Sequence, residues 1–185
     1  MVRSHVDASA VDPQAEAARE QALSFVRRDA PGERIATLRR EMAQSMEDGC
    51  GIYRTAATMQ ATCDKLAELK DRVKRVRLDD HSSGWNTEWL MALELDFQLD
   101  VARAMAHSAL QRRESRGSHQ RLDGFEQRDD VNFLQHSLAY WQGDDTPRIG
   151  YGPVKITRSP PGTRAYGAAG EAADAERKAK GPLHA

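Results

Sequence analysis

One segment of the chain, residues 86–113, is helix-forming and carries apolar side chains on more than one face. One face carries Trp89, Leu90, Leu93, Phe97 and Val101, and the other carries Met91, Leu95, Leu99 and Ala102. A helix with so broad an apolar surface packs between neighbouring elements rather than on the outside of a protein. We therefore expect this helix, with Asn86 or Thr87 as its N-cap, to lie at the centre of the fold.

Two shorter segments, residues 33–47 and 55–78, have the helical spacing needed to pack against it. Their apolar faces are Ile35, Leu38, Met42 and Met46 in the first, and Met59, Cys63, Leu66, Val73 and Val76 in the second. We expect Gly49 to Gly51 to end the first segment in a left-handed conformation, and Thr55 to cap the second. The polar residues expected on the solvent side of the second segment are Lys65, Glu68, Lys70 and Asp71. Together the three segments predict an antiparallel bundle.

Further elements are expected at both ends of this bundle. Asp12 followed by Pro13 predicts the start of a helix that runs to Arg28. After a polar loop, a short helix over residues 129–136 precedes two strands, 137–141 and 148–156, which a hairpin loop joins. Beyond Pro161 the sequence has no apolar periodicity, which predicts an extended, partly disordered tail.

These elements place the chain in the mainly α class. The predicted architecture is an antiparallel three-helix bundle with a preceding helix and a C-terminal β-hairpin plus an extended tail. The expected units are residues 1–32, which lead into the bundle, 33–136 for the bundle itself, 137–158 for the hairpin and 159–185 for the tail.

The composition excludes several classes of function. Lys and Arg total 27 against 28 Asp and Glu, so no basic excess predicts a broad nucleic-acid footprint. No apolar run reaches the roughly 18 residues that span a bilayer, and the N-terminus has no apolar signal-peptide core. Cys50 and Cys63 alone do not make a disulfide framework. We therefore expect a cytoplasmic protein.

The chain lacks the sequence signatures of a flavin or metal site. A dinucleotide is held where a glycine-rich turn joins a strand to a helix, and no G-x-G-x-x-G is present. Gly49-Cys50-Gly51 and Gly150-Tyr151-Gly152 both lack the third glycine. None of the six histidines has a second ligand at metal-binding spacing. We expect this chain alone to bind neither a flavin nor a metal.

The loop after the long helix, residues 112–128, is rich in charge. Its centre is Glu114-Ser115-Arg116-Gly117-Ser118-His119. Arginine offers five donors in a fixed geometry, so it can clamp a facing carboxylate or backbone. The alternative is that Arg112, Arg113 and Arg116 are a solvated helix end that complements the helix dipole. Both interpretations are open on the residues alone.

This loop and several other motifs resemble the C-terminal helical domain of the flavoprotein subunit of fumarate reductase and succinate dehydrogenase. The motifs occur in the same order as in that family over residues 35–167. They are residues 46–55 (MEDGCGIYRT), 106–109, 112–119, 128–133, 136–140, 154–157 and the prolines at 160 and 161. The GCGIYRT and DDVNFL segments are closest to the bacterial quinol-linked fumarate reductases.

The resemblance implies a redox enzyme of which this chain holds a non-catalytic part. Family members interconvert fumarate and succinate at an FAD in an N-terminal domain, which this chain does not contain. An iron–sulfur subunit passes electrons between the flavoprotein and a quinone-binding membrane anchor. The implied partners are therefore the flavin domain and the iron–sulfur subunit, with no direct membrane insertion, at the inner face of the cytoplasmic membrane. Residues 1–32 would be the exit from the flavin domain, and no catalytic residue is carried over.

Within this resemblance we hypothesise that Glu114, Arg116 and His119 face the flavin domain and fix the domain arrangement. Two other functions are consistent with the residues alone. The chain could be a helical scaffold that binds a protein partner through the narrow apolar stripe of its first helix. It could also bind nucleic acid through Arg112, Arg113, Arg116 and Arg121, although the near-neutral net charge argues against this.

Overall fold

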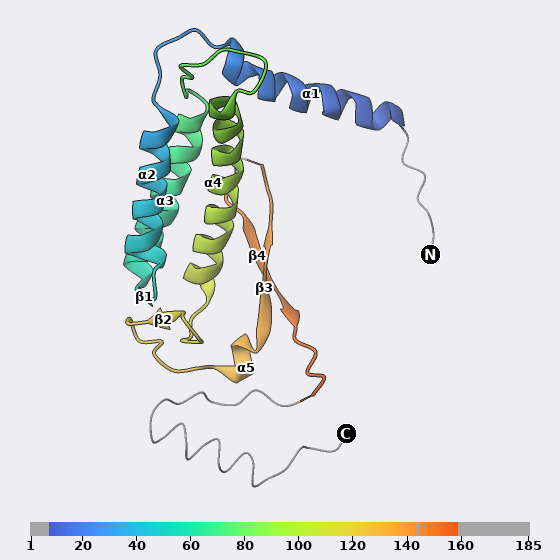
Figure 1. Cartoon of the computed structure of the whole chain (residues 1–185). Helices are drawn as coiled ribbons and strands as arrows, with labels where there is room; N and C mark the ends of the chain where they lie inside the picture. The colour runs from blue at the N-terminus through green and yellow to red at the C-terminus, as the bar shows by residue number, and fades with distance from the viewer. Residues whose placement is uncertain (1–7, 144, 159–185) are drawn as a thin grey trace.

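The computed structural model describes residues 8–143 and 145–158. Five helices and four short strands make up the described part of the chain (Figure 1). The helices are α1 (Ala8–Arg27), α2 (Ile35–Cys50), α3 (Ala56–Val73), α4 (Thr87–Gln111) and α5 (Asp130–Phe133). The strands are β1 (Tyr53–Arg54), β2 (Gln120–Arg121), β3 (Gln135–Tyr140) and β4 (Arg148–Pro153). The predicted tail, 159–185, lies outside the described residues.

Helices α2, α3 and α4 lie side by side and form the predicted antiparallel three-helix bundle (Figure 1). The mainly α fold is therefore confirmed. Side chains from all three helices, and from the segment after α3, form one apolar core. Its most buried large members are Leu38, Leu66, Leu69, Val73, Val76, Leu78, Leu95 and Leu99.

The predicted hairpin is present, with β3 and β4 antiparallel and packed on α4. Ser137 and Tyr151 are register partners on the face toward α4, where the Tyr151 hydroxyl donates to the Gln111 carbonyl at 3.3 Å. Leu138 and Tyr140 lie on the other face, over the glycines at 152 and 150. The hairpin therefore covers one side of α4 and leaves Leu138 and Tyr140 partly exposed.

A second pair of strands was not expected from the sequence. β1 precedes α3 and β2 follows α4, and the two pair in parallel. The Gln120 amide donates to the Ile52 carbonyl at 3.0 Å, and the Leu122 amide donates to the Arg54 carbonyl at 2.9 Å. This pair joins the end of α2 to the loop after α4 at one end of the bundle, which we call the base.

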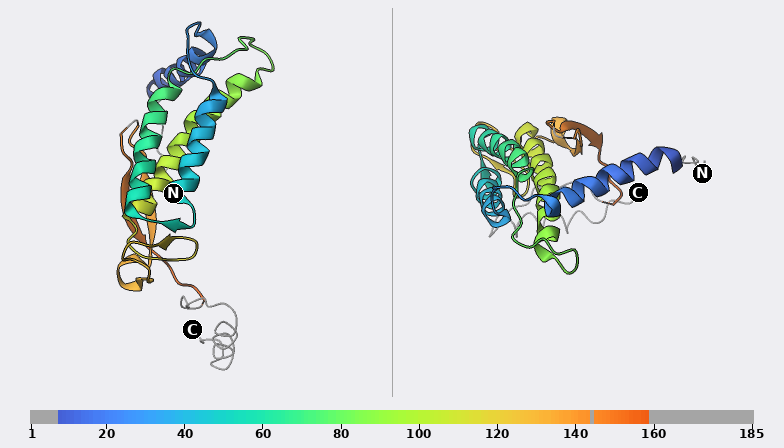
Figure 2. Two further views of the ribbon diagram at one scale, coloured as in Figure 1. Left: turned by 90° about the vertical axis from the view of Figure 1, so that its left-hand side faces the viewer. Right: turned by 90° about the horizontal axis from the view of Figure 1, so that it is seen from above.

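The first helix differs from the prediction at its start. Asp12 is not the N-cap, because α1 begins at Ala8 and Pro13 lies inside it. The helix projects sideways from the end of the bundle opposite the base, and most of its length is exposed (Figure 2). Only its last turns contact the bundle, where Phe25 is buried and the Trp89 indole donates to the Ala22 carbonyl at 2.8 Å.

Several predicted helix ends were wrong. The second helix continues through Gly49 to Cys50, and Gly51 has φ −59°, which is not left-handed. Gly49 is needed for packing instead, because a Cβ there would lie 2.0 Å from Thr62 Oγ1 on α3. The third helix ends at Val73 rather than near residue 78, and the short helix ends at Phe133 rather than at residue 136. The N-caps predicted at Thr55 and Asn86 are confirmed.

Lys70 was predicted to face solvent, and this prediction was wrong. Its side chain is 8% exposed, and its ammonium lies 2.6 Å from Asp96 and 3.0 Å from Asp100 on α4. A buried lysine requires an opposite charge, since an unpaired one would be strongly destabilising. The signal in the sequence was the i, i+4 pair of aspartates on the most apolar helix.

The two predicted apolar faces of α4 are each buried only in part: Trp89 and Leu93 of the first face pack against the core, and Met91 of the second face is 45% exposed. Leu95, Leu99 and Ala102 from the second face lie in the core. Leu90, Phe97 and Val101 from the first face are 55%, 65% and 60% exposed. The prediction that neighbours surround α4 therefore holds for the core side and fails for the outward side.

Trp85, before the N-cap of α4, is fully exposed and has φ +57°. A left-handed backbone costs a residue with a Cβ roughly 1 kcal/mol or more, whereas asparagine adopts it more readily. We expect Trp85→Asn to raise the free energy of unfolding by about 0.5–1 kcal/mol in a urea titration. Trp85→Phe, which keeps the strain, should match the wild type, and a Trp85→Asn variant less stable than wild type would contradict this explanation.

Candidate functional site

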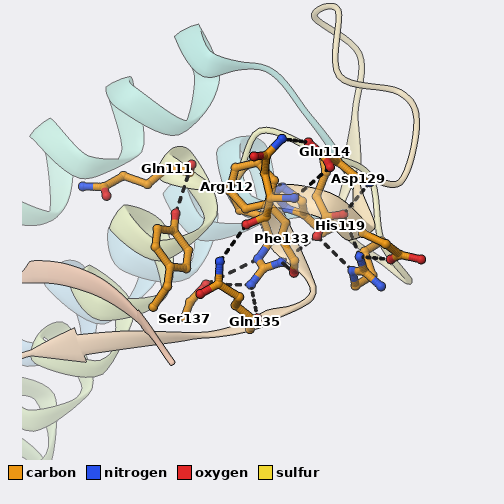
Figure 3. Close-up of polar contacts among 12 residues, drawn as sticks. Gln111, Arg112, Glu114, His119, Asp129, Phe133, Gln135 and Ser137 are labelled. Carbon is orange, nitrogen blue, oxygen red and sulfur yellow. Dashed lines mark hydrogen bonds and ion pairs between the residues drawn. The ribbon is translucent and has the colours of Figure 1, made fainter. Parts of the chain in front are cut away.

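The predicted Arg–Glu motif forms a buried ionic cluster at the base, and Glu114 is at its centre. The Glu114 side chain is 0% exposed and its carboxylate accepts four hydrogen bonds (Figure 3). Arg116 donates two of them at 2.9 Å each, in a bidentate pair. The Arg112 guanidinium donates the third, and the Asp129 amide the fourth at 2.9 Å. Both oxygens of the Glu114 carboxylate therefore accept hydrogen bonds from groups of the chain itself.

The Glu114 carboxylate stays ionised despite its position. Burial alone would raise the pKa of Glu114, but the hydrogen bonds from Arg116, the Asp129 amide and Arg112 outweigh it. The net effect is a pKa below the ordinary value. A carboxylate in this state is a structural anion and not a general acid near neutral pH.

Arg112 joins the end of α4 to α5 and β3. Its guanidinium donates to the carbonyls of Phe133 at 2.8 Å and Gln135 at 2.7 Å, and to the Ser137 hydroxyl at 3.0 Å (Figure 3). Its guanidinium carbon also lies 5.5 Å from the centre of the Phe133 ring. These bonds hold the hairpin at a set position relative to α4.

Arg116 connects the buried part of the cluster to residues at the protein surface. In addition to Glu114, it contacts Asp130 at 2.7 Å, and Arg128 contacts the other oxygen of Asp130 at 2.6 Å. The side chains of Arg116 and Arg128 are each 28% exposed, and that of Asp130 is 37% exposed. The surface group of Arg116, Asp130 and Arg128 is therefore held in position by the ion pair between Arg116 and the buried Glu114.

His119 lies at the base between β1 and the C-terminal end of α4. Its Nδ1 accepts from the Arg54 guanidinium at 2.8 Å, so its Nε2 carries the proton and donates to the Arg112 carbonyl at 3.1 Å. Burial and the positive charges of Arg54, Arg121 and Arg112 lower the pKa of His119, although the bond to the Arg112 carbonyl opposes this. His119 is therefore neutral at pH 7 and links β1 to the end of α4.

A second ion pair, Arg121–Asp123, connects two helix ends. Arg121 is 2% exposed and pairs with both oxygens of Asp123, at 2.8 and 2.7 Å. It also donates to the Arg112 carbonyl at 3.0 Å, beyond the C-terminus of α4. Asp123 accepts from the Ala56 amide at the N-terminus of α3 at 2.5 Å. Each charge complements the helix dipole that it meets.

The structure thus brings together all three predicted site residues, but inside the chain rather than on an open surface. Glu114 and His119 are buried and Arg116 is partly exposed. Sequence reasoning missed the roles of Arg54, Asp123 and Asp129. Arg112 is not a solvated helix end, and Arg121 is buried, so two of the four arginines suggested for nucleic-acid binding are occupied by internal hydrogen bonds.

The lowered pKa values of His119 and Glu114 predict that the free energy of unfolding falls as the pH falls. The folded-state pKa of His119 is below the ordinary 6.5, so below that pH the unfolded chain takes up the proton first and stability is lost. Glu114 adds a second loss below its ordinary 4.5, because its folded-state pKa is also lowered. Urea titrations should give a lower free energy of unfolding at pH 5.5 than at pH 7.5.

His107 has a lowered pKa for the same leading reason, burial, so it contributes with the same sign. His119→Gln isolates the contribution of the cluster and should reduce the difference between the two pH values. A difference as large as that of the wild type would show that His119 does not contribute.

The connection from β1 to α3 does not have the form of a dinucleotide-binding turn. β1 passes into α3 through Arg54 and Thr55, with no glycine at the turn. The N-terminus of α3, where a pyrophosphate would bind, is already occupied by the Asp123 carboxylate, which would repel it. Between residues 8 and 158, Asp144 apart, no group of three or more His, Cys, Asp or Glu side chains is placed to hold a metal ion. In the same residues no helix is long and apolar enough to cross a membrane.

Comparison with known proteins identifies the class of this fold, the C-terminal domain of a flavoprotein subunit. At 16% identity and a TM-score of 0.62, the fold alone is shared with the adenylylsulfate reductase of Archaeoglobus fulgidus. The chain belongs to the fumarate reductase and succinate dehydrogenase flavoprotein family: the model for "Fumarate reductase flavoprotein C-term" matches residues 39–166. The family resemblance noted in the sequence is confirmed.

Two relatives show how much of the family protein the chain represents. It is 55% identical over 93% of its length to the fumarate reductase flavoprotein subunit of a Serratia strain, of which it covers 28%. A quinol fumarate reductase structure from E. coli matches 88% of the chain with a TM-score of 0.79 and 51% identity, and 28% of that chain is covered. The chain therefore spans a little over a quarter of the length of these relatives.

Proposed function

We propose that this chain serves as the C-terminal helical domain of a fumarate reductase, in which FAD held by the preceding part of the flavoprotein interconverts fumarate and succinate. The observation that supports this is the family match over residues 39–166, with relatives that are fumarate reductase flavoprotein subunits. FAD would supply hydride transfer, and this domain would contribute structure. The partners would be the flavin domain and an iron–sulfur subunit of a complex at the inner face of the cytoplasmic membrane.

The chemistry of the base supports a structural role. Its buried acid, Glu114, is ionised and fully hydrogen-bonded, and its buried histidine is neutral with both ring nitrogens engaged. Neither group is free to exchange a proton with a substrate. The cluster instead fixes α4, α5, β3 and the β1–β2 pair relative to one another.

The interface role of Glu114, Arg116 and His119 is part of this proposal. Arg116 and Asp130 provide the exposed surface that would meet the flavin domain, while Glu114 and His119 would hold that surface in place from below. Arg116→Ala, placed at the equivalent position of the Serratia protein, should reduce flavin content or subunit assembly. Arg116→Lys keeps one charge but loses the bidentate pairing, so it should restore these only in part.

Co-expression tests the function directly. The chain is produced together with the part of the Serratia flavoprotein that precedes the matching segment, and a tag on the chain is used for purification. A yellow complex with fumarate-dependent oxidation of a reduced dye is the expected result. If the flavin-bearing part neither binds the chain nor gains activity from it, the proposed function is wrong.

A further inference from the structure

We infer that the outward face of α4 is the docking surface for the preceding, flavin-bearing part of the flavoprotein. This inference rests on the proposed function and names the surface that the partner covers. The surface, which we call the outer stripe, consists of Phe97, Val101, Ala104, Met105 and Ser108. It is separate from the ionic cluster at the base, whose exposed residues would meet the same partner.

Most of the outer stripe is apolar, and its three large side chains are exposed. Phe97, Val101 and Met105 are 65%, 60% and 57% exposed, and they follow each other at intervals of four residues. They extend over roughly 12 Å of one helix face, at 1.5 Å per residue. Isolated exposed apolar residues are ordinary, but a continuous row of large ones marks an interaction surface.

Two charged residues in this part of α4 are directed elsewhere, whereas Glu94, which is exposed, lies one turn before Phe97 on the same side of the helix. Asp100 pairs with Lys70 of α3, and Arg103, which is buried, donates to the Asp145 carbonyl at 2.7 Å. The residues of the outer stripe itself are therefore uncharged, and Glu94 borders the stripe at one end. The outer stripe fits a partner with an apolar surface of its own.

A hollow of about 380 Å³ continues this surface at the end of the stripe nearer α1. Phe25, Val73, Phe97 and Trp141 form the apolar part of its lining, and the rest of the lining is largely polar, with the charged Lys70, Asp96 and Asp100 among it. Trp141 is 74% exposed, so its ring is available to a partner as well. A projecting apolar side chain of the partner would fit between Phe97 and Trp141, which is how interface anchors are commonly held.

The direction of α1 identifies the occupant. The chain corresponds to the C-terminal part of its relatives and to 28% of their length, so most of each relative precedes α1 in sequence. From its contact with the bundle, α1 runs toward its N-terminus away from α2 and α3, on the side where the hairpin lies (Figure 1, Figure 2). The preceding polypeptide thus arrives on the side of α4 that is not covered by α2 and α3. That side carries the outer stripe.

A graft tests the inference in a complete flavoprotein. The matching segment of the Serratia protein is replaced by this chain, with Val101→Asp or with Ala43→Asp as the control. Ala43 is an exposed residue of α2, so both variants add one carboxylate to an exposed helix position. Flavin content and the unfolding midpoint of each graft are measured, together with the midpoint of the same variants in the isolated chain.

We expect Val101→Asp to lower the flavin-loaded yield of the graft about tenfold, corresponding to the burial of an unpaired charge in the interface. Ala43→Asp should leave the graft unchanged, and the isolated chain should tolerate both substitutions equally. If the Val101→Asp graft matches the Ala43→Asp graft, the inference is overturned while the proposed function stands. If the unmodified graft takes up no flavin, both fail. If Val101→Asp only abolishes self-association of the isolated chain, the occupant is a second copy and the inference is also wrong.

Discussion

Replacing Glu114 with alanine is expected to lower the free energy of unfolding by about 3 kcal/mol or more. The substitution removes the carboxylate that Arg112 and Arg116 share, and it leaves the Asp129 amide without its acceptor. Arg112 is only 14% exposed, so its charge cannot simply return to water. Removing one partner of a buried ion pair is costly because the other charge stays desolvated. Urea titration at pH 7.5 measures the loss.

Two further variants separate this effect from a general sensitivity of the loop. Glu126→Ala removes an exposed carboxylate a few residues away and should change stability by less than about 0.5 kcal/mol. Glu114→Gln keeps the shape and some hydrogen bonds but loses the charge, so it should fall between the alanine variant and the wild type. If Glu114→Ala and Glu126→Ala have equal effects, the cluster does not stabilise the base.

Replacing Gly49 with valine should be of comparable cost, about 3 kcal/mol. A Cβ at this position would lie 2.0 Å from Thr62 Oγ1 and 2.6 Å from the Thr58 carbonyl oxygen, so α2 and α3 would have to separate. The Thr58 carbonyl belongs to the backbone of α3 and cannot rotate away. Thermal unfolding followed by circular dichroism should show a clearly lower midpoint with helical content retained at low temperature.

Gly84→Ala is the matched control, because a Cβ there would meet no atom within 4 Å. It should leave the unfolding midpoint close to that of the wild type. Gly49→Ala should fall between, since alanine gains about 1 kcal/mol of helix propensity but still makes the contact with Thr62. A Gly49→Ala protein more stable than the wild type would show that the helices separate at little cost.

The bundle could be predicted because its signals are local. Apolar spacing identified α2, α3 and α4, and the short side chains of Thr55 and Asn86 marked two helix starts correctly. Helix ends were less predictable, because they depend on tertiary contacts. Gly49 is the clearest case: its position suggested a left-handed cap, whereas it is a helical residue that allows α3 to approach.

The base could be predicted only in part. The motif around Glu114 and Arg116 indicated an arginine–carboxylate clamp, which the structure contains. The partners of His119 could not be inferred, since Arg54 is 65 residues away in sequence. The same applies to Asp123, which caps a helix that begins 67 residues earlier. Such pairs follow from topology, and no local pattern in the chain encodes them.

The parallel pairing of β1 with β2 has a consequence for the order of folding. Helices α3 and α4 are neighbours in sequence, so they can form and associate with little loss of chain entropy. The two strands can meet only after both helices are complete, because β1 precedes α3 and β2 follows α4 in the chain. Closure of the base is thus the late event, and in reverse it is where the molecule opens first. The amides of Gln120 and Leu122 would report that opening by exchanging with solvent before those of the core helices.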